Sequence, residues 1–251
     1  MSAQPVVSIE NLVKRFPVKS GLFKGARYVY AVNGVSLDLN EGETLGLVGE
    51  SGCGKSTVGK LIMKLHHPSD GAIFLRGVNI AGLSRRAMVP MWRKVQTIFQ
   101  DPYSSLNPRM SAGAIVGESL TIHRIASGAE KTRRVAEIFE KVGLRADQMG
   151  RFPHEFSGGQ RQRLSIARAL IVEPELSVAD EPVGARDVSI QASVINLLIR
   201  LQKEMGLSML FISHDMSVVE HVSHRVAVMY LGRIVEIGSR RQIFGDPQHP
   251  Y

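Results

Sequence analysis

Alternation of apolar and polar residues predicts a first group of strands near the N-terminus. Residues 6–13, 29–39 and 71–80 alternate or run apolar over short distances, and Gly, Asn and Asp separate them. Short segments of this kind between turn residues are typical of antiparallel strands. We therefore expect an antiparallel sheet in the N-terminal part of the chain.

Later apolar segments have a different character. They are short, almost continuously apolar and separated by helical patterns, which is typical of a parallel sheet covered on both faces. These segments are residues 44–49, 95–99, 176–180 and 208–213.

Helices are predicted by apolar residues at positions i, i+3, i+4 and i+7. Residues 135–142 and 194–201 follow this spacing, and Gly143 stands where a C-terminal cap is expected. Between residues 100 and 156 no apolar strand interrupts the helical segments, so we expect a helical lobe inserted into an α/β body. Residues 225–238 predict a hairpin that turns at 231–233, followed by a polar tail.

Composition fits an ordinary globular protein. Of the 251 residues, 44% are hydrophobic and 22% charged, and no apolar segment is long enough to cross a bilayer. The N-terminus lacks the pattern of a secretion signal, so we expect the chain to stay in the cytosol. The single cysteine, Cys53, excludes an internal disulfide and a cysteine-only metal site within these residues.

The net positive charge is compatible with an anionic partner but does not indicate which kind. The chain carries +8 at pH 7, with a pI near 9.8. Its basic residues are scattered along the sequence, whereas a nucleic-acid interface would cluster them on one element. A diffuse basic surface is therefore the favoured interpretation, and no nucleic-acid partner is expected.

The segment GESGCGKST is the first candidate for chemistry. Gly49, Gly54, Lys55 and Ser56 occupy the fixed places of the pattern G-x-x-x-x-G-K-[ST], between a predicted strand and a predicted helix. Glycines let backbone N–H groups surround a polyphosphate, while the lysine reaches the β and γ phosphates and the serine reaches Mg²⁺. The alternative is a glycine-rich turn with a chance lysine. Cys53 fills a place that the pattern leaves open, so we expect a small filler role.

A pair of carboxylates at the end of another predicted strand strengthens this interpretation. In LSVADE, Asp180 could hold the Mg²⁺ shell, and Glu181 could orient or deprotonate a water. On their own, two acids at a strand end are more often a helix cap or a solvated loop.

The stretch FSGGQRQR decides the class, because it resembles the signature sequence of ATP-binding-cassette proteins. Three further residues match that family in order: Gln100 in the Q-loop, Asp187 in the D-loop and His214 as the switch histidine. The resemblance spans nearly the whole chain. It implies a RecA-like P-loop NTPase fold, class α/β, with a parallel-sheet core, an N-terminal antiparallel β subdomain and an inserted α-helical subdomain.

The resemblance also implies boundaries and a dimer. One nucleotide-binding domain would fill residues 1–251, with β subdomain and core in 1–101 and 157–251 and the helical subdomain in 102–156. The signature forms a second anion-binding site at a helix start, which the chain cannot easily fold onto its own phosphate loop. In the family, the signature of one subunit closes over ATP held by another, and hydrolysis separates them.

By this resemblance, ATP and Mg²⁺ are the cofactors, and the residues divide among three roles. Catalysis is expected from Glu181, His214 and Gln100. Metal binding is expected from Ser56, Gln100 and Asp180. Nucleotide contacts are expected from Gly49, Ser51, Gly52, Cys53, Gly54, Lys55, Ser56, Thr57, Ser157, Gly158, Gly159, Gln160, Asp187 and Tyr30. For adenine stacking, Phe16 and Tyr28 compete with Tyr30.

Within the family, the phrases DPYSSLNPRM, DVSIQA, MYLGRIVEIG and DPQHPY resemble the peptide and nickel importer branch. The resemblance implies an ATPase at the cytoplasmic face of the membrane that powers import of oligopeptides, dipeptides, glutathione or nickel. Its implied partners are two permease subunits, a second cassette, identical or related, and indirectly a substrate-binding protein. In that branch HPY leads into a further C-terminal segment, which we expect to be absent because the chain stops at Tyr251.

Three residues depart from the branch pattern: Ser177 in the acidic strand, and Gly184 and Arg186 in the D-loop. We expect a buried Ser177 hydroxyl to find a hydrogen-bond partner or to cost about 1–3 kcal/mol. We expect Arg186 to weaken dimer closure and to lower the basal ATPase activity. Two rival functions remain. A soluble cassette ATPase acting on nucleic acid or ribosomes would fit the basic charge, and an unrelated P-loop kinase or GTPase would leave SGGQ unexplained.

Overall fold

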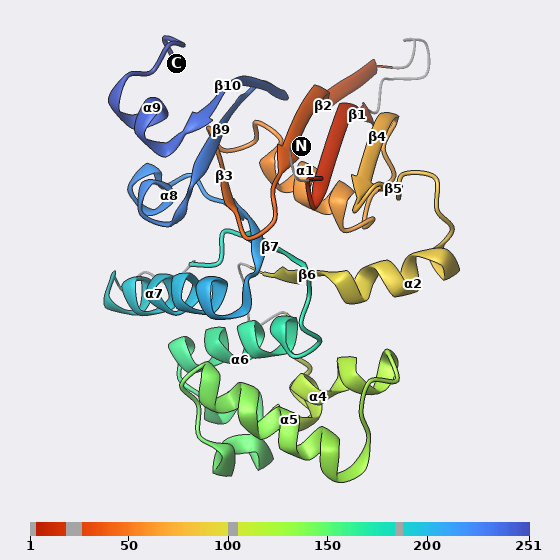
Figure 1. The fold of residues 1–251 in the computed structure, drawn as a ribbon, viewed down its shortest axis with the longest axis vertical. Coiled ribbons are helices and arrows are strands. Elements are labelled where there is room, and N and C mark those ends of the chain that lie inside the picture. The colour runs from red at the N-terminus through yellow and green to blue at the C-terminus, as the bar shows by residue number, and fades with distance from the viewer. Residues whose placement is uncertain (1–3, 19–26, 100–104, 184–187) are drawn as a thin grey trace. The chain divides into compact units, whose positions relative to one another are not determined.

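The chain divides into two compact units, which are described separately. Unit 1 consists of Met1–Met88 and Ser208–Tyr251, and unit 2 of Val89–Leu207. The computed structural model describes residues 4–18, 27–99, 105–183 and 188–251 (Figure 1). The domain boundaries expected at residues 101 and 156 stay a prediction.

Unit 1 opens with the predicted antiparallel sheet. Its strands, in the order β2-β1-β4-β5, are β1 Val7–Val18, β2 Arg27–Leu39, β4 Asp70–Leu75 and β5 Val78–Asn79. Ile9 pairs with Leu37 on one side and with Ile73 on the other, and all three side chains are buried. The apolar face of the sheet therefore faces the core of unit 1, and the antiparallel prediction is confirmed.

A second sheet of unit 1 carries the phosphate-loop strand at its centre. Its members, in the order β10-β9-β3-β8, are β3 Thr44–Val48, β8 Ser208–Ile212, β9 Arg225–Tyr230 and β10 Arg233–Ser239. Strand β3 is parallel to both β8 and β9, and all five of its residues are buried. The parallel arrangement that the continuous apolar runs predicted is confirmed here.

Among the described residues, three helices lie wholly in unit 1, and the boundary after Met88 falls inside a fourth. They are α1 Lys55–Ile62, α8 Met216–Val222, α9 Arg240–Gly245 and, at the boundary, α2 Arg85–Lys94. The hairpin β9–β10 turns at Leu231 and Gly232, whose φ angles of 44° and 81° suit a tight two-residue turn. This confirms the predicted hairpin.

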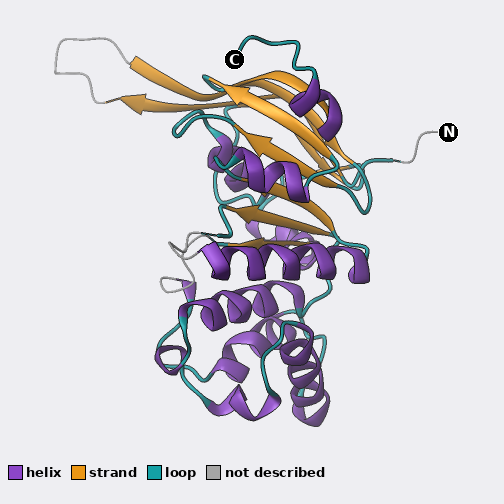
Figure 2. Cartoon of the chain, turned by 90° about the vertical axis from the view of Figure 1, so that its left-hand side faces the viewer, coloured by secondary structure: helices purple, strands orange, loops and turns teal. Residues whose placement is uncertain are grey.

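Among the described residues, unit 2 contains a parallel strand pair, four α-helices and two 3₁₀ helices. Its elements are β6 Val95–Ile98, β7 Leu176–Asp180, α4 Ala112–Ile122, α5 Gly128–Lys141, α6 Gly158–Leu170, α7 Val188–Met205 and the 3₁₀ helices η1 Ala146–Gly150 and η2 Pro153–Glu155. Helices α4, α5 and α6 gather as one cluster (Figures 1 and 2). No strand occurs between residues 105 and 156, as the helical pattern predicted.

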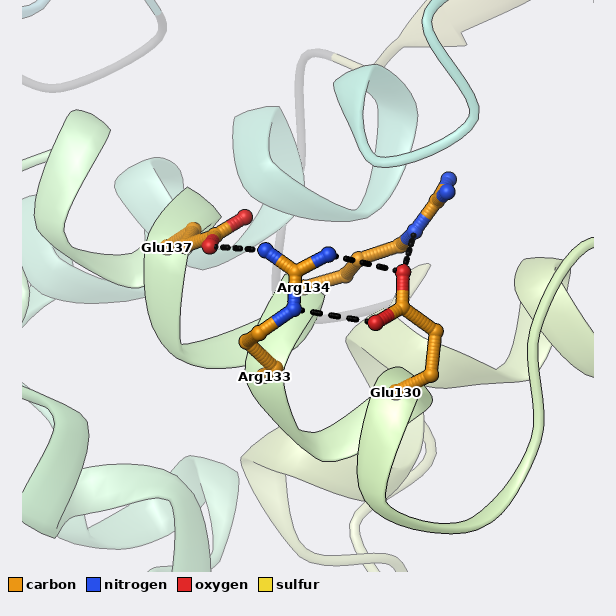
Figure 3. Close-up of polar contacts among 4 residues, drawn as sticks. All are labelled: Glu130, Arg133, Arg134 and Glu137. Carbon is orange, nitrogen blue, oxygen red and sulfur yellow. Dashed lines mark hydrogen bonds and ion pairs between the residues drawn. The ribbon is translucent and has the colours of Figure 1, made fainter.

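Helix α5 illustrates how the sequence pattern produces the local structure. Its apolar stripe is buried, and Gly143 adopts the positive φ of 75° that a C-terminal cap requires. On its outer face, Glu130 accepts hydrogen bonds from Arg133 and Arg134, and Arg133 also reaches Glu137 (Figure 3). These guanidinium groups, Arg133 first, lower the pKa of Glu130 to about 2. The network stays charged well into the acid range.

Among the described residues, no helix combines the length and apolar character that crossing a bilayer demands.

Candidate functional site

The predicted phosphate loop joins the end of β3 to the start of α1 in unit 1. Gly54, at φ 111°, is the N-cap residue of α1, and no side chain of the described residues caps the helix there. First-turn N–H groups of an α-helix have no partner within the helix, and the helix dipole adds positive potential. The loop thus ends in a site suited to an anion.

Two of the loop glycines are required by close backbone approach. A Cβ on Gly49 would lie 2.0 Å from the Met229 carbonyl oxygen, and one on Gly54 would lie 2.0 Å from that of Ala31. Both residues also have positive φ angles, of 147° and 111°. Neighbouring strands therefore press on the loop so closely that only glycine fits.

Lys55 is the first residue of α1, where the loop ends, and is only 5% exposed. Its Nζ donates to the carbonyl oxygens of Gly49 at 2.7 Å and Glu50 at 2.9 Å. Cys53 is buried beside it, with Sγ 3.7 Å from Nζ, in a position that agrees with a filler role. A buried cation held by neutral carbonyls, beside an uncapped helix start, is a donor set that fits a polyphosphate.

The three aromatic candidates for adenine stacking lie on β1 and β2. Phe16 stands edge-on to His66, at 5.5 Å between ring centroids, and the Arg15 guanidinium lies 5.0 Å from the Tyr28 ring. Tyr30 is 48% exposed and precedes Ala31, whose carbonyl presses on the phosphate loop. Strand β2 therefore brings Tyr30 beside the loop, and its stacking role stays a prediction.

His214 lies in the same unit, directly after β8. The turn that carries it is well defined, because Ser213 Oγ accepts the Asp215 N–H at 3.0 Å, and Asp215 Oδ1 caps α8. His214 lines a pocket of about 460 Å³ together with Gly49 and Glu50. The structure thus brings the predicted switch histidine to the phosphate loop.

The predicted acidic pair ends β7 in unit 2. Both Asp180 and Glu181 are half-buried, and Glu181 has a φ of 46°, a left-handed conformation that is uncommon for a non-glycine residue. The buried Gln162 of α6 donates a short hydrogen bond to the carbonyl oxygen of Pro182. This contact ties the signature helix to the residue that follows Glu181.

The signature residues form the beginning of α6. Ser157 is the N-cap: its Oγ accepts the Gln160 N–H at 3.3 Å, and Gln160 Oε1 accepts the Ser157 N–H at 3.0 Å. Ser157 and Gly158 are exposed, and a Cβ on Gly158 would meet open space. An exposed helix start with a small glycine is an accessible surface for an anionic group.

Several predicted positions cannot be placed. Gln100, Gly184, Arg186 and Asp187 lie outside the described residues, and the roles assigned to them stay predictions. Among the described residues, no group of three or more His, Cys, Asp or Glu side chains could hold a metal ion.

A family model described as ABC transporter matches residues 32–184, more than half of the chain. The chain belongs to the ABC transporter family. The resemblance that the signature sequence indicated is thereby confirmed.

Curated relatives of this ABC transporter chain are named as glutathione import ATP-binding proteins. The chain is 53% identical to the glutathione import ATP-binding protein GsiA of Salmonella paratyphi A and 52% identical to that of Escherichia coli K12. In both cases the alignment covers 100% of this chain and 40% of the relative. The chain thus spans about two fifths of the length of these relatives.

Solved structures confirm the predicted ABC cassette fold. The dimeric post-hydrolysis structure of the ATP-binding cassette MJ0796, bound to ADP and Pi, superposes with a TM-score of 0.82 at 28% identity, covering 94% of this chain and 99% of MJ0796. CbiO1 of Clostridium perfringens, part of the transporter complex cbiONQ, gives a TM-score of 0.83 at 25% identity, covering 97% and 92%.

Sequence reasoning missed two contacts of this ABC cassette. One is the hydrogen bond from Gln162 to Pro182, and the other joins Tyr251 to Glu50 of the phosphate loop. Gln162 belongs to the motif SGGQRQR and Tyr251 to DPQHPY. The sequence does not indicate the partner of either residue, because neither contact follows a periodic pattern.

Proposed function

We propose that the chain is the ATP-hydrolysing cassette of an ABC importer for glutathione or a related peptide. The observation that carries this proposal is the phosphate loop, where buried Lys55 and an uncapped helix start form a polyphosphate cradle. The name of the GsiA relatives supports glutathione as the solute class. The chain spans two fifths of those relatives, and reconstitution, described below, tests the solute.

ATP would be held by the loop residues Gly49–Thr57, with Lys55 exchanging its carbonyl partners for phosphate oxygens. Mg²⁺ would be held by oxygen donors, the Ser56 hydroxyl and the Asp180 carboxylate, which are the ligand types this ion prefers. When bound, Mg²⁺ would neutralise charge that develops on the phosphate oxygens. Glu181 would orient the attacking water and accept its proton, and His214 would donate a hydrogen bond toward the terminal phosphate.

A second cassette is part of the proposal. Ser157 and the amides of Gly158 and Gly159 would close over nucleotide held by the partner copy, which the dimeric structures of MJ0796 support by analogy. Two permease subunits and, through them, a substrate-binding protein would complete the transporter, placing the cassette at the cytoplasmic face of the membrane. ATP would favour the closed dimer, and hydrolysis would release it.

Two substitutions test this proposal. In Glu181→Gln the water loses its base, so ATP and Mg²⁺ should give a persistent dimer with little turnover, measured by size-exclusion chromatography and phosphate release. In Gly158→Asp a carboxylate at the exposed start of α6 would repel phosphate, so nucleotide should bind without dimerisation. Vigorous hydrolysis by Gly158→Asp would refute the composite site.

Reconstitution with the neighbouring permease and binding protein then tests the solute. Glutathione or a related peptide should raise the ATPase rate above that of the complex without solute. Stimulation by nucleic acid in place of peptide would favour the rival soluble ATPase.

A further inference from the structure

The residues after α9 fold back onto the strands that position the phosphate loop. Strand β10 carries Glu236, whose carboxylate accepts the N–H groups of Gln248 at 3.0 Å and His249 at 2.9 Å. These two hydrogen bonds lower the pKa of Glu236. The segment 246–251, here called the return segment, is therefore anchored to β10 by a charged acceptor.

The end of the return segment contacts the phosphate loop directly. The hydroxyl of Tyr251 accepts the backbone N–H of Glu50 at 3.0 Å, a contact between residues 201 positions apart. The Tyr251 ring lies on that of Tyr230, at 4.7 Å between centroids. A further hydrogen bond, from the Tyr251 N–H to His249 Nδ1 at 3.1 Å, fixes the backbone that leads to the ring.

The partner ring also belongs to the neighbourhood of the loop. Tyr230 ends β9, the strand that runs parallel to β3, with Val228 opposite Val48. Met229 precedes Tyr230, and its carbonyl oxygen is the atom that would lie 2.0 Å from a Cβ on Gly49. The aromatic pair thus stands on the same strand end that shapes the beginning of the loop.

The return segment and the predicted switch residue line the same pocket, of about 460 Å³. Its lining includes His249, Pro250 and Tyr251 of the return segment as well as Glu50 and His214. The return segment is therefore a wall of the space next to the phosphate loop, as well as a contact to its backbone.

We propose that Tyr251 is a positioning residue for the phosphate loop, acting through the N–H group of Glu50. This rests on the proposed function only in that the loop is taken to bind ATP. In the structure, the peptide groups around Glu50 are held from both sides: Lys55 holds the carbonyl oxygens of Gly49 and Glu50, and Tyr251 holds the Glu50 N–H.

Under the proposed function, nucleotide binding should affect these two restraints differently. Lys55 would turn to the β and γ phosphates and give up its hydrogen bonds to the two carbonyl oxygens. The Tyr251 contact involves an N–H group on the side of the return segment, so it persists and keeps the loop in the conformation that receives phosphate. Preorganisation of this kind raises affinity, because less ordering has to accompany binding.

The test is Tyr251→Phe, which removes the hydroxyl and keeps the ring on Tyr230. Loss of one neutral hydrogen bond corresponds to an about 2- to 10-fold rise in the Kd for a non-hydrolysable ATP analogue with Mg²⁺, measured by calorimetry. The kcat should stay within about twofold of the parent chain. Without nucleotide, amide hydrogen exchange of the peptide covering residues 49–55 should become faster, while exchange in α5 stays unchanged.

Tyr230→Phe is the matched control, because it removes the hydroxyl of the other ring in the same pair. It should leave both the Kd and the exchange of residues 49–55 at parent values. Equal exchange and equal Kd in Tyr251→Phe and the parent would overturn the proposal. If the parent chain itself fails to bind the analogue, the proposed function fails, while the exchange measurement still decides the role of Tyr251.

Discussion

Ser177 offers the sharpest test of the energetics of unit 2. It lies in β7, pairs with Gln96 of β6 and is 0% exposed, and its Oγ has no hydrogen-bond partner among the described residues. A buried hydroxyl without a partner loses its hydration and gains nothing in return, a penalty of about 1–3 kcal/mol. Of the two outcomes expected from the sequence, a partner or a cost, the structure indicates the second, because the described residues supply no partner.

Ser177→Ala removes the hydroxyl and leaves a methyl group. The penalty is recovered, less a few tenths of a kcal/mol because alanine is less favourable than serine on many strand positions. We expect a net stabilisation of about 1–2 kcal/mol. At about 2–4 °C per kcal/mol for a chain of this size, the melting temperature should rise by about 2–8 °C.

Urea and thermal unfolding of the parent and the variant provide the measurement. Ser208→Ala is the matched control: Ser208 lies in β8, is 1% exposed, and its Oγ accepts the Gly42 N–H at 3.0 Å. The free energy of unfolding of Ser208→Ala should fall by about 0.5–1.5 kcal/mol. If Ser177→Ala destabilised the protein as much as Ser208→Ala, the Ser177 hydroxyl would have a partner, and the reasoning would be refuted.

Two further predictions follow from the described contacts. Gln162→Leu removes the hydrogen bond to the Pro182 carbonyl. It should lower kcat about tenfold with unchanged nucleotide affinity, because Glu181 is held less firmly. The control is Gln202→Leu, which loses a hydrogen bond to Leu207 and should affect stability alone. The return segment should detach in acid. The N–H groups of Gln248 and His249 lower the pKa of Glu236 in the folded protein. The stability that Glu236 gives to the return segment is therefore complete above the ordinary pKa of 4.5 and is lost as the pH falls through the folded pKa. Proteolysis of the C-terminus should therefore accelerate at low pH in the parent, and Glu236→Gln should be sensitive already at pH 7.

Much of the fold could be predicted because local chemistry determines it. Alternating residues gave the antiparallel strands, and continuous apolar runs gave β3 and β8, whose two faces are both covered. Gly143 and Gly232 marked a helix end and a hairpin turn, since both adopt positive φ angles that other residues resist. In these places the propensity of the segment and the tertiary structure agree.

The glycine-rich turn between β3 and α1 could be predicted for a related reason. The phosphate-binding role proposed for it depends on backbone N–H groups and a lysine within nine consecutive residues, so the spacing alone indicates that chemistry. The return segment could not be predicted in this way. Residues 245–251 appear as a polar tail, and nothing in their spacing indicates that Tyr251 reaches Glu50 or that Glu236 anchors the backbone. Long-range contacts of single side chains leave no period in the sequence.

The missed contacts have one physical feature in common, although they belong to different units. Each is a hydrogen bond to the backbone beside a residue or loop with a proposed role in binding or catalysis: Tyr251 beside the predicted phosphate loop, and Gln162 beside Glu181. A side chain that restrains backbone changes how well a neighbouring group is preorganised, without touching substrate itself. Loosening the loop should therefore weaken binding, whereas loosening the segment after Glu181 should slow turnover. Tyr251→Phe should therefore change the Kd and Gln162→Leu the kcat, because the two side chains hold different segments of backbone.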